Sequence, residues 1–244
     1  MEEQGADWQR RVVGRSLNGA TQRSIDRGAR FIRAAAKVLE RTQGESLTVQ
    51  EVADEAGQSL RTLYQYFASK DDLLLAVFEE AMRTHARILR SAIAGFTDPE
   101  ERLAAALIAS ARLPALHGKV GVDRGLSHLR LQLGQADPAL VARSQEPVTS
   151  VFHELVSDAT GSLGSGLEAE EATFLVASGR TAYLLAMTLG NEYGVEPPGI
   201  IDFVRYCLGG LGLQHPRSWY EAVDERLELS GGDGRSILRR LAKG

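Results

Sequence analysis

The spacing of apolar residues restricts the fold of this chain more than any other feature of its sequence. Apolar side chains recur every three or four positions along most of the chain, as on one face of an α-helix and unlike a β-strand. One such stripe predicts an amphipathic helix over about residues 25–41. It consists of Ile25, Ala29, Ile32, Ala36 and Leu39. Because sustained apolar–polar alternation is missing from the sequence, we predict an all-α protein.

Residues that favour helix ends divide the rest of the chain. Thr48 is followed three residues later by Glu51, the capping-box pattern of a helix start, and this short helix stops at Gly57. Comparable start signals occur at Ser59, at Ser69 with Asp72, at Asp98-Pro99 and at Asp137-Pro138. The later helices are predicted over about residues 60–67, 69–93, 99–116, 119–134, 138–160, 168–191, 198–213 and 217–229, before a short basic helix at the C-terminus. We expect Pro147 to kink or split the helix over 138–160.

Composition narrows the class of protein. Hydrophobic residues make up 43% and charged residues 25% of the 244 residues, which excludes wholesale disorder and a fibre. The longest uncharged run, 181–191, is short beside the roughly 20 residues of a membrane helix. The first eleven residues lack the apolar segment of a signal peptide. We therefore expect a soluble, cytoplasmic protein.

Basic residues are concentrated near the N-terminus. Residues 10–41 contain nine Lys and Arg residues against two acidic ones, a local excess of +7, although the whole chain carries a formal charge of −4. Such a block favours a polyanionic partner, and a solvated helix face is the alternative. Within it, Arg10, Arg11, Arg15 and Arg23 lie in a segment without a clear apolar stripe. We expect residues 1–23 to form a flexible basic arm that reaches this polyanion, or else a solvated tail.

Residues 48–70 have the proportions of a helix-turn-helix, with two short predicted helices separated by four residues, 56–59. Gly57 can adopt the positive φ that such a turn requires. Leu63 and Phe67, four residues apart, would anchor the second helix and leave its hydroxyl, amide and guanidinium groups outward. The residues expected to face outward are Arg61, Thr62, Tyr64, Gln65 and Tyr66. These groups suit phosphates and base edges of the major groove. An ordinary helical hairpin whose tyrosines cover a core is the alternative.

The run TLYQYFASKDDLL at 62–74, preceded by Thr48, Val52-Ala53 and the helix with Ile32, Ala36 and Leu39, resembles the N-terminal domain of TetR-family transcriptional regulators. The resemblance extends over about residues 25–75. It implies a homodimer that binds a palindromic operator, usually as a repressor. It also implies release from DNA when a small ligand occupies the C-terminal domain.

The resemblance assigns DNA contacts position by position. Thr62, Tyr64, Tyr66 and Lys70 match DNA-contacting positions, with Tyr64 and Lys70 on phosphates and Tyr66 nearer the bases. Thr48 matches a phosphate clamp, and Gln50 matches a position that can reach bases. The bulky Leu60-Arg61 pair departs from the common pattern, and Arg61 reads a guanine or holds a phosphate. The predicted DNA-binding residues are Thr48, Gln50, Ser59, Leu60, Arg61, Thr62, Tyr64, Tyr66 and Lys70.

The effector site is predicted from polar and adaptable residues between broad apolar helix faces. Candidates include His85, Arg130, His153 and Asn191, and the residues we favour are Arg112, His117, His128, Phe152, Tyr183 and Met187. An inward-facing Arg112 or Arg130 would need an acidic ligand or an internal carboxylate, because a buried unpaired charge is costly. For each of these residues a surface or core position is the alternative.

Small residues mark a close helix–helix contact, because they allow backbones to approach. They concentrate in the last two long helices, and the family pairs its last two principal helices in a dimer interface. The predicted interface residues are Ala177, Gly179, Ala182, Ala186, Gly209 and Gly210. A hairpin buried inside a monomer would have the same composition.

Sequence motifs for catalysis are missing. The chain has no H-E-x-x-H motif, and its one cysteine, Cys207, excludes a disulfide framework and a Cys-rich zinc site. We expect no catalytic residues, no metal and no cofactor. Two alternatives remain: an all-α enzyme or carrier in which the hairpin is structural, and a protein that coats DNA without sequence preference.

The expected domains are a basic arm at 1–23, a three-helix helix-turn-helix domain at 24–70, a ligand-binding and dimerisation domain at 71–214 and an extension at 215–244. The expected function is regulation of transcription as a homodimeric repressor. Its partners would be a double-stranded DNA operator and a small apolar or amphipathic effector, with no membrane.

Overall fold

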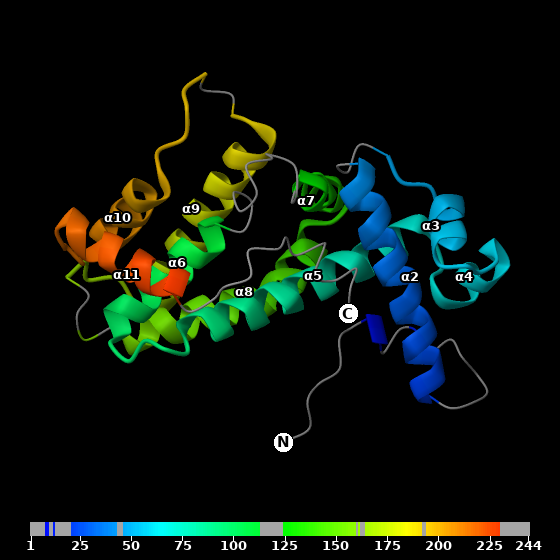
Figure 1. Ribbon diagram of the computed structural model, residues 1–244, viewed down its shortest axis with the longest axis horizontal. Helices are drawn as coiled ribbons and strands as arrows, with labels where there is room; N and C mark the ends of the chain where they lie inside the picture. Colours follow the sequence, from blue (N-terminus) through cyan, green and yellow to red (C-terminus); the bar gives the residue numbers. More distant parts are fainter. Residues whose placement is uncertain are drawn as a thin grey trace. The chain divides into compact units, whose positions relative to one another are not determined.

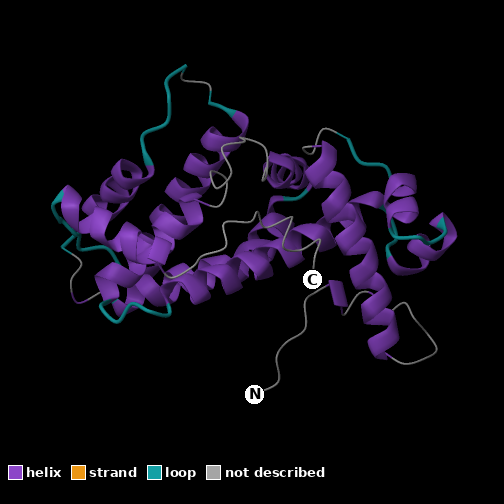
Figure 2. Cartoon of the chain, in the orientation of Figure 1, coloured by secondary structure: helices purple, strands orange, loops and turns teal. Residues whose placement is uncertain are grey.

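Helices make up the regular structure of the described part of the chain. The computed structural model describes residues 8–9, 12, 21–42, 46–112, 124–159, 161, 164–191 and 194–229. No strand occurs among these residues (Figure 2). The prediction of an all-α protein is confirmed.

The helix bounds follow the capping signals closely, as the labels in Figure 1 allow the reader to trace. They are α2 Thr21–Thr42, α3 Val49–Glu55, α4 Leu60–Tyr66, α5 Lys70–Ile93, α6 Pro99–Arg112, α7 Arg124–Ala136, α8 Pro138–Asp158, α9 Ala169–Leu189, α10 Ile200–Gly210 and α11 Arg217–Leu229. Pro147 lies inside α8, which continues through it as one helix, so the expected split does not occur. The short basic helix expected at the C-terminus falls outside the described residues.

The chain divides into two compact units. One contains α2 to α4, α5 as far as Thr84, α7, and α8 as far as Gln145. The other contains α5 from His85, α6, α8 from Glu146, and α9 to α11. This division differs from the boundary expected at residue 70, because α7 packs against α2 and because α5 and α8 each continue from one unit into the other. We call the two units the N-terminal unit and the C-terminal unit.

The core of the N-terminal unit is built on the apolar stripe of α2. Phe31, Ile32 and Leu39 are at most 3% exposed, and α2 packs against α3 and α7. The ring of Phe67 meets that of Phe31 edge to face, with centroids 6.3 Å apart. The two helices of the hairpin therefore rest on α2 through buried aromatic and aliphatic side chains.

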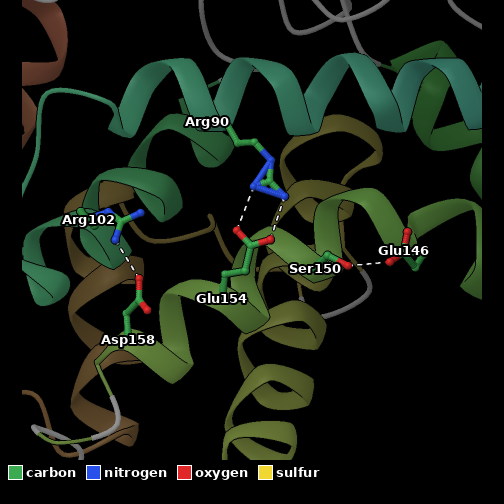
Figure 3. Close-up of polar contacts among 6 residues, drawn as sticks. All are labelled: Arg90, Arg102, Glu146, Ser150, Glu154 and Asp158. Atoms are coloured by element: carbon green, nitrogen blue, oxygen red, sulfur yellow. Dashed lines mark hydrogen bonds and ion pairs between the residues drawn. The ribbon is translucent and has the colours of Figure 1, made fainter. Parts of the chain in front are cut away.

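In the C-terminal unit, α6 is the central helix. Leu103, Leu107 and Ile108 are fully buried, and α6 packs against α9, α10 and α11. Two ion pairs join helices to α8: Arg90 of α5 forms two 2.9 Å hydrogen bonds with Glu154 of α8, and Arg102 of α6 contacts Asp158 of α8 at 2.7 Å (Figure 3). Since all four side chains are partly solvated, these pairs orient the helices more than they stabilise them.

The N-terminal residues correct one expectation. Trp8 and Val12 lie in helical backbone and are 3% and 1% exposed. They are four residues apart and face the same way, a short apolar stripe that the surrounding glycines and arginines obscure in the sequence. This part of the arm is therefore packed rather than free, whereas Arg10, Arg11 and Arg15 lie outside the described residues.

Candidate nucleic-acid interface and effector region

The turn between α3 and α4 is short and closed by backbone hydrogen bonds. The amide of Gln58 donates to the carbonyl of Ala53 at 3.0 Å, and Gly57 between them has φ +62°. Glycine adopts this left-handed conformation without the steric cost that a Cβ would bring. Ser59 then caps α4 by accepting the Thr62 amide at 3.0 Å. The turn thus sets two short helices in the order of a helix-turn-helix.

The two faces of α4 differ sharply in exposure. Leu63 is fully buried, and Phe67, which caps the helix, is 1% exposed. Arg61 and Gln65 are exposed, and Tyr64 is 48% exposed. The free face of α4 therefore presents a guanidinium, an amide and a phenol.

Tyr66 lies on the inner side of α4. It is 7% exposed, and its ring lies against Phe31 with centroids 6.0 Å apart. The hydroxyl of Thr62 is engaged as well, because it lies 2.8 Å from the Ser59 hydroxyl. Leu60 and Thr62 are half-buried, so Arg61 and Tyr64 are the most accessible of the side chains assigned to this helix.

The start of α3 carries the capping box expected from Thr48 and Glu51. The Thr48 hydroxyl accepts the Glu51 amide at 3.2 Å, and the Thr48 amide donates to Glu51 Oε2 at 2.8 Å. The same hydroxyl donates to Glu51 Oε2, and these bonds lower the pKa of the Glu51 carboxyl, with the Thr48 side chain as the main cause. A phosphate bound at this helix end would share the Thr48 hydroxyl with that carboxylate. Gln50 is exposed and donates to Asp54 at 2.8 Å.

Part of the basic block is used inside the N-terminal unit. Lys37 and Arg41 of α2 lie 3.2 and 3.5 Å from the two carboxylate oxygens of Glu55 in α3. Arg27 and Arg30 of α2 are exposed, as is Lys70 at the start of α5. Some of the basic residues thus form ion pairs between α2 and α3, and others are exposed to solvent.

Residues 31–77 match the family model "Bacterial regulatory proteins, tetR family", and this segment contains the whole hairpin described above. This segment belongs to the TetR family. Over 207 residues it is 27% identical to the transcriptional activator FasR of Mycolicibacterium smegmatis, a match that covers 83% of this chain and 91% of FasR.

Other relatives match the chain over its N-terminal part. The regulator HbdR of Aromatoleum sp. is 33% identical over 78 residues, or 32% of this chain, and BetI of Brucella canis is 36% identical over 75 residues, or 31% of this chain. The matched segment spans 34% of HbdR and 38% of BetI. These matches are regulators by name and indicate no family of enzymes.

Solved structures agree with the fold of the chain. RolR in complex with resorcinol superposes with a TM-score of 0.60 at 20% identity, covering 87% of this chain and 96% of RolR. FadR from Bacillus halodurans superposes with a TM-score of 0.58 at 21% identity, covering 78% of this chain and 97% of FadR. AibR in complex with isovaleryl coenzyme A and operator DNA superposes with a TM-score of 0.50 at 16% identity, covering 76% of this chain and 97% of AibR. At these identities the likeness concerns the fold.

The residues predicted for the effector site are divided between the two units. In the C-terminal unit, Arg112 pairs with Asp224 at 2.6 Å, which supplies an internal carboxylate for this arginine. His128 belongs to the N-terminal unit, where Arg124 Nε lies 3.5 Å from its Nε2. His117 lies outside the described residues. Arg130 is half-buried, and desolvation lowers the pKa of its guanidinium.

Phe152, Tyr183 and Met187 remain in the C-terminal unit. Phe152 is fully buried, and Met187 is half-buried. Tyr183 stacks on Phe203 with ring centroids 4.1 Å apart and donates its hydroxyl to the Pro198 carbonyl at 2.9 Å. Burial raises the pKa of this phenol.

A buried polar cluster in the C-terminal unit includes a residue that sequence reasoning missed. His85 Nε2 lies 3.2 Å from the Ser110 hydroxyl, to which Arg180 Nη1 donates at 3.3 Å. The Arg180 guanidinium also lies over the Phe152 ring, 5.5 Å from its centroid. Burial, with a further contribution from Arg180, holds the pKa of His85 well below its ordinary value, so the imidazole is neutral at pH 7. Arg180 was not predicted as a site residue, because the small residues beside it in the sequence predicted a dimer interface there.

An open groove of about 770 Å³ lies along α9, α10 and the residues that lead into α11. Gly179, Gly209 and Gly210 line it, together with Cys207, whose thiol has a pKa raised to about 12 by burial. The two helices lie side by side (Figure 1). Ala182 is exposed on α9, whereas Ala177 and Ala186 are half-buried.

Large apolar side chains are exposed on the same two helices. Phe174 is 69%, Leu175 51% and Tyr206 82% exposed, an unusual concentration for a water-facing surface. Among the described residues, α9 is also the helix with the length and composition of a membrane span, although 33% of its apolar window is buried. A core helix of a soluble protein meets the same criterion, so this helix is weak support for a membrane span.

Proposed function

We propose that this protein is a ligand-responsive transcriptional regulator that represses its target genes. It acts as a homodimer on a palindromic DNA operator in the cytoplasm and is released by a small apolar or amphipathic effector. The observation that carries the proposal is the outer face of α4, where Arg61, Tyr64 and Gln65 are exposed on a helix whose opposite side is packed into a helix-turn-helix.

Contacts with DNA are distributed by the position of each side chain. Arg61 lies in the first turn of α4, and an arginine there can donate two hydrogen bonds to a guanine in the major groove. Tyr64 and Lys70 would hold phosphates, and Thr48, Gln50 and Ser59 lie at the starts of α3 and α4, where amide groups favour a phosphate. The burial of Tyr66 makes Arg61 the stronger candidate for base recognition.

Arg61→Ala is expected to weaken binding to the preferred operator by about 5- to 150-fold, equivalent to about 1–3 kcal/mol, because a bidentate base contact is lost. Lys70→Ala, which removes a phosphate contact, should weaken all duplexes alike and reduce the salt slope by about one unit. Fluorescence anisotropy on selected and random duplexes measures both effects. Equal losses on the two duplexes for Arg61→Ala would exclude a role in base recognition.

The same titration separates this proposal from its two rivals. An enzyme or carrier with a structural hairpin would bind neither duplex, and a DNA-coating protein would bind both equally. Selection of bound sequences from a random duplex library would supply the operator. A palindromic operator would also support the two-fold symmetry of the bound protein.

The partner we propose for the α9–α10 face is a second copy of the chain. Phe174, Leu175 and Tyr206 expose apolar area there, and the glycines of the groove allow a partner helix to approach closely. A two-fold axis at this face would let two copies of α4 enter successive major grooves, about 34–36 Å apart. The exposed composition of α9 then reflects an interface between subunits.

The effector proposal rests on the C-terminal unit. RolR, Bacillus subtilis FadR and AibR have been crystallised with resorcinol, stearoyl-CoA and isovaleryl coenzyme A, all apolar or amphipathic compounds. In this chain, Phe152, Tyr183 and Met187 are candidate contacts, and the cluster of His85, Ser110 and Arg180 would face a polar or acidic group of the effector. Arg112, paired with Asp224, is the weaker candidate.

Operator and effector should oppose each other's binding. If the effector favours a conformation that fits DNA poorly, the operator must weaken effector binding by the same factor, typically about 5- to 150-fold, or about 1–3 kcal/mol. Isothermal titration of an active effector with and without saturating operator checks this. Equal effector affinity in both titrations would rule out coupling for that compound.

Activation of transcription is a second candidate, and the observation that favours it is the match with FasR, which is an activator by name. A reporter gene placed behind the selected operator distinguishes the two. Higher expression in the absence of the protein supports repression, and lower expression supports activation.

A further inference from the structure

The apolar stripe of α2 continues into an arginine. Phe31, Ala34 and Val38 lie at helical spacing on the inner face of α2, and each is at most 3% exposed. Arg27 stands four residues before Phe31 on the same line along the helix, yet it is exposed. Side chains on this line are buried where another helix covers them, so α2 extends beyond that cover at Arg27.

The contacts of Phe31 show which helix covers the stripe next to Arg27. The centroid of the Phe31 ring lies 6.0 Å from that of Tyr66 and 6.3 Å from that of Phe67. Tyr66 ends α4 and Phe67 caps it. Arg27 is one turn farther along α2, about 6 Å by the helical rise, and it faces the side on which α4 lies. In Figure 1 the blue start of α2 accordingly extends past α4.

The depth of the major groove matches the spacing of two packed helices. The axes of packed helices are about 8–10 Å apart, and the major groove of B-DNA is about 8.5 Å deep. When α4 lies on the floor of the groove, α2 behind it is therefore level with the phosphates along the rim. A guanidinium that faces DNA from this level, as that of Arg27 does, meets a phosphate rather than a base.

The other basic side chains of α2 have different positions. Lys37 and Arg41 form ion pairs with Glu55 of α3. Arg30 is exposed, but it lies about 60° around the helix from Arg27. Among the described side chains of α2, Arg27 is thus the exposed cation that continues the stripe covered by α4.

We propose that Arg27 is a further DNA-contacting residue: beyond the edge of α4, its guanidinium binds a phosphate on the rim of the major groove that α4 enters. The inference rests on the proposed DNA-binding function. It extends the contact surface from the hairpin to α2, which then has a role besides packing. Because a phosphate contact carries no sequence information, base recognition stays with α4.

Three variants isolate the charge at this position. Arg27→Gln removes the charge and keeps a long side chain with good helix propensity, whereas Arg27→Lys retains the charge. Arg143→Gln is the matched control, because Arg143 is an exposed arginine of α8 in the same unit. Since residue 27 is exposed, its variants should keep the circular dichroism and melting temperature of the wild type.

The dependence of DNA affinity on salt concentration measures the loss of a phosphate contact. Each contact contributes about 0.9 to the log–log slope, so Arg27→Gln should lower its magnitude by about 0.9 for every subunit on the DNA. The same relation predicts about eightfold weaker binding per subunit at 0.1 M salt and no loss near 1 M. Operator and random duplexes should lose affinity alike. Arg27→Lys should restore most of the slope, and Arg143→Gln should leave it unchanged.

Single neutral phosphates locate the contact on the DNA. In a series of operators that each carry one methylphosphonate, wild-type binding should weaken wherever a contacted phosphate loses its charge. For Arg27→Gln, one of these positions in each half-site should cause no further loss, while the other positions keep their effect. That position should lie on the rim of the groove that α4 enters.

The outcomes separate this inference from the proposed function. A wild-type protein that binds no selected duplex contradicts the proposed function and removes the basis for the inference. A wild-type salt slope in Arg27→Gln, or an equal change in Arg143→Gln, overturns the inference alone. It is also overturned if every methylphosphonate keeps its effect in Arg27→Gln, or if that variant loses affinity for the operator only.

Discussion

Ala182→Glu is expected to convert the protein into monomers and to abolish specific operator binding. Residue 182 is exposed on α9 and follows Leu175 and Gly179 at helical spacing, on the face proposed to meet a second copy. A glutamate buried at that contact would lose its hydration without gaining a partner cation, which costs several kcal/mol. A monomer offers one copy of α4, so specific affinity should fall by about 10³-fold or more, toward non-specific binding.

Sedimentation equilibrium and operator titration check the two halves of this expectation. Ala222→Glu is the matched control, because residue 222 is exposed on α11 and lies outside the groove lining. Gly179→Glu, beside Cys207 in the groove, should behave like Ala182→Glu. A stable dimer in both α9 variants would place the interface elsewhere on the protein.

Gly212→Ala should lower the stability of the C-terminal unit by about 2–5 kcal/mol, because two costs coincide. The residue has φ +86°, and a Cβ would lie 2.6 Å from both the Cα and the backbone nitrogen of Gly164. Rigid backbone cannot yield as a side chain would. For a chain of this length the expected fall in melting temperature is about 5–15 °C.

Two other glycines separate the two costs. Gly57→Ala places an alanine at a φ of +62°, where its Cβ would meet nothing within 4 Å. It should therefore cost about 1–2 kcal/mol from backbone strain alone. Gly95→Ala meets neither problem and should be near neutral. Thermal unfolding followed by circular dichroism should give the highest melting temperature for Gly95→Ala, a lower one for Gly57→Ala and the lowest for Gly212→Ala. A Gly212 variant as stable as the Gly95 variant would contradict the close contact between the two backbones.

The helices could be read from the sequence because their signals are local. Thr48 with Glu51, Ser59 and Pro138 act on atoms within one turn, and each marks a helix start in the structure. The split expected at Pro147 does not occur, because a proline removes only one backbone hydrogen bond and α8 continues through it. Trp8 and Val12 were missed because their partners, Gly28 and Glu79, are distant in the sequence.

The candidate sites show the same difference between local signals and contacts of residues that are distant in the sequence. The exposed face of α4 follows from Leu63 and Phe67, which fix the rotation of a short helix, and so Arg61 and Tyr64 could be selected from sequence. Tyr66, placed outward both by the helical spacing and by the resemblance, lies in the core because it is adjacent to Phe67 and meets Phe31. The effector residues stay a prediction: α7 packs on α2, so His128 belongs to the N-terminal unit, whereas Phe152 and Tyr183 belong to the C-terminal unit.

The division of the chain into its two units has a consequence for building sensors by domain exchange. Fusing a foreign DNA-binding domain at residue 70 would leave α7, residues 124–136, facing an α2 with which it did not evolve. A working hybrid needs four junctions, near residues 84, 120, 145 and 235, two of which fall inside the continuous helices α5 and α8. At those two junctions the donor and recipient helices must be joined in phase, because each inserted residue turns everything beyond it by about 100°. Modularity in this molecule is therefore a matter of helical register rather than of linker length.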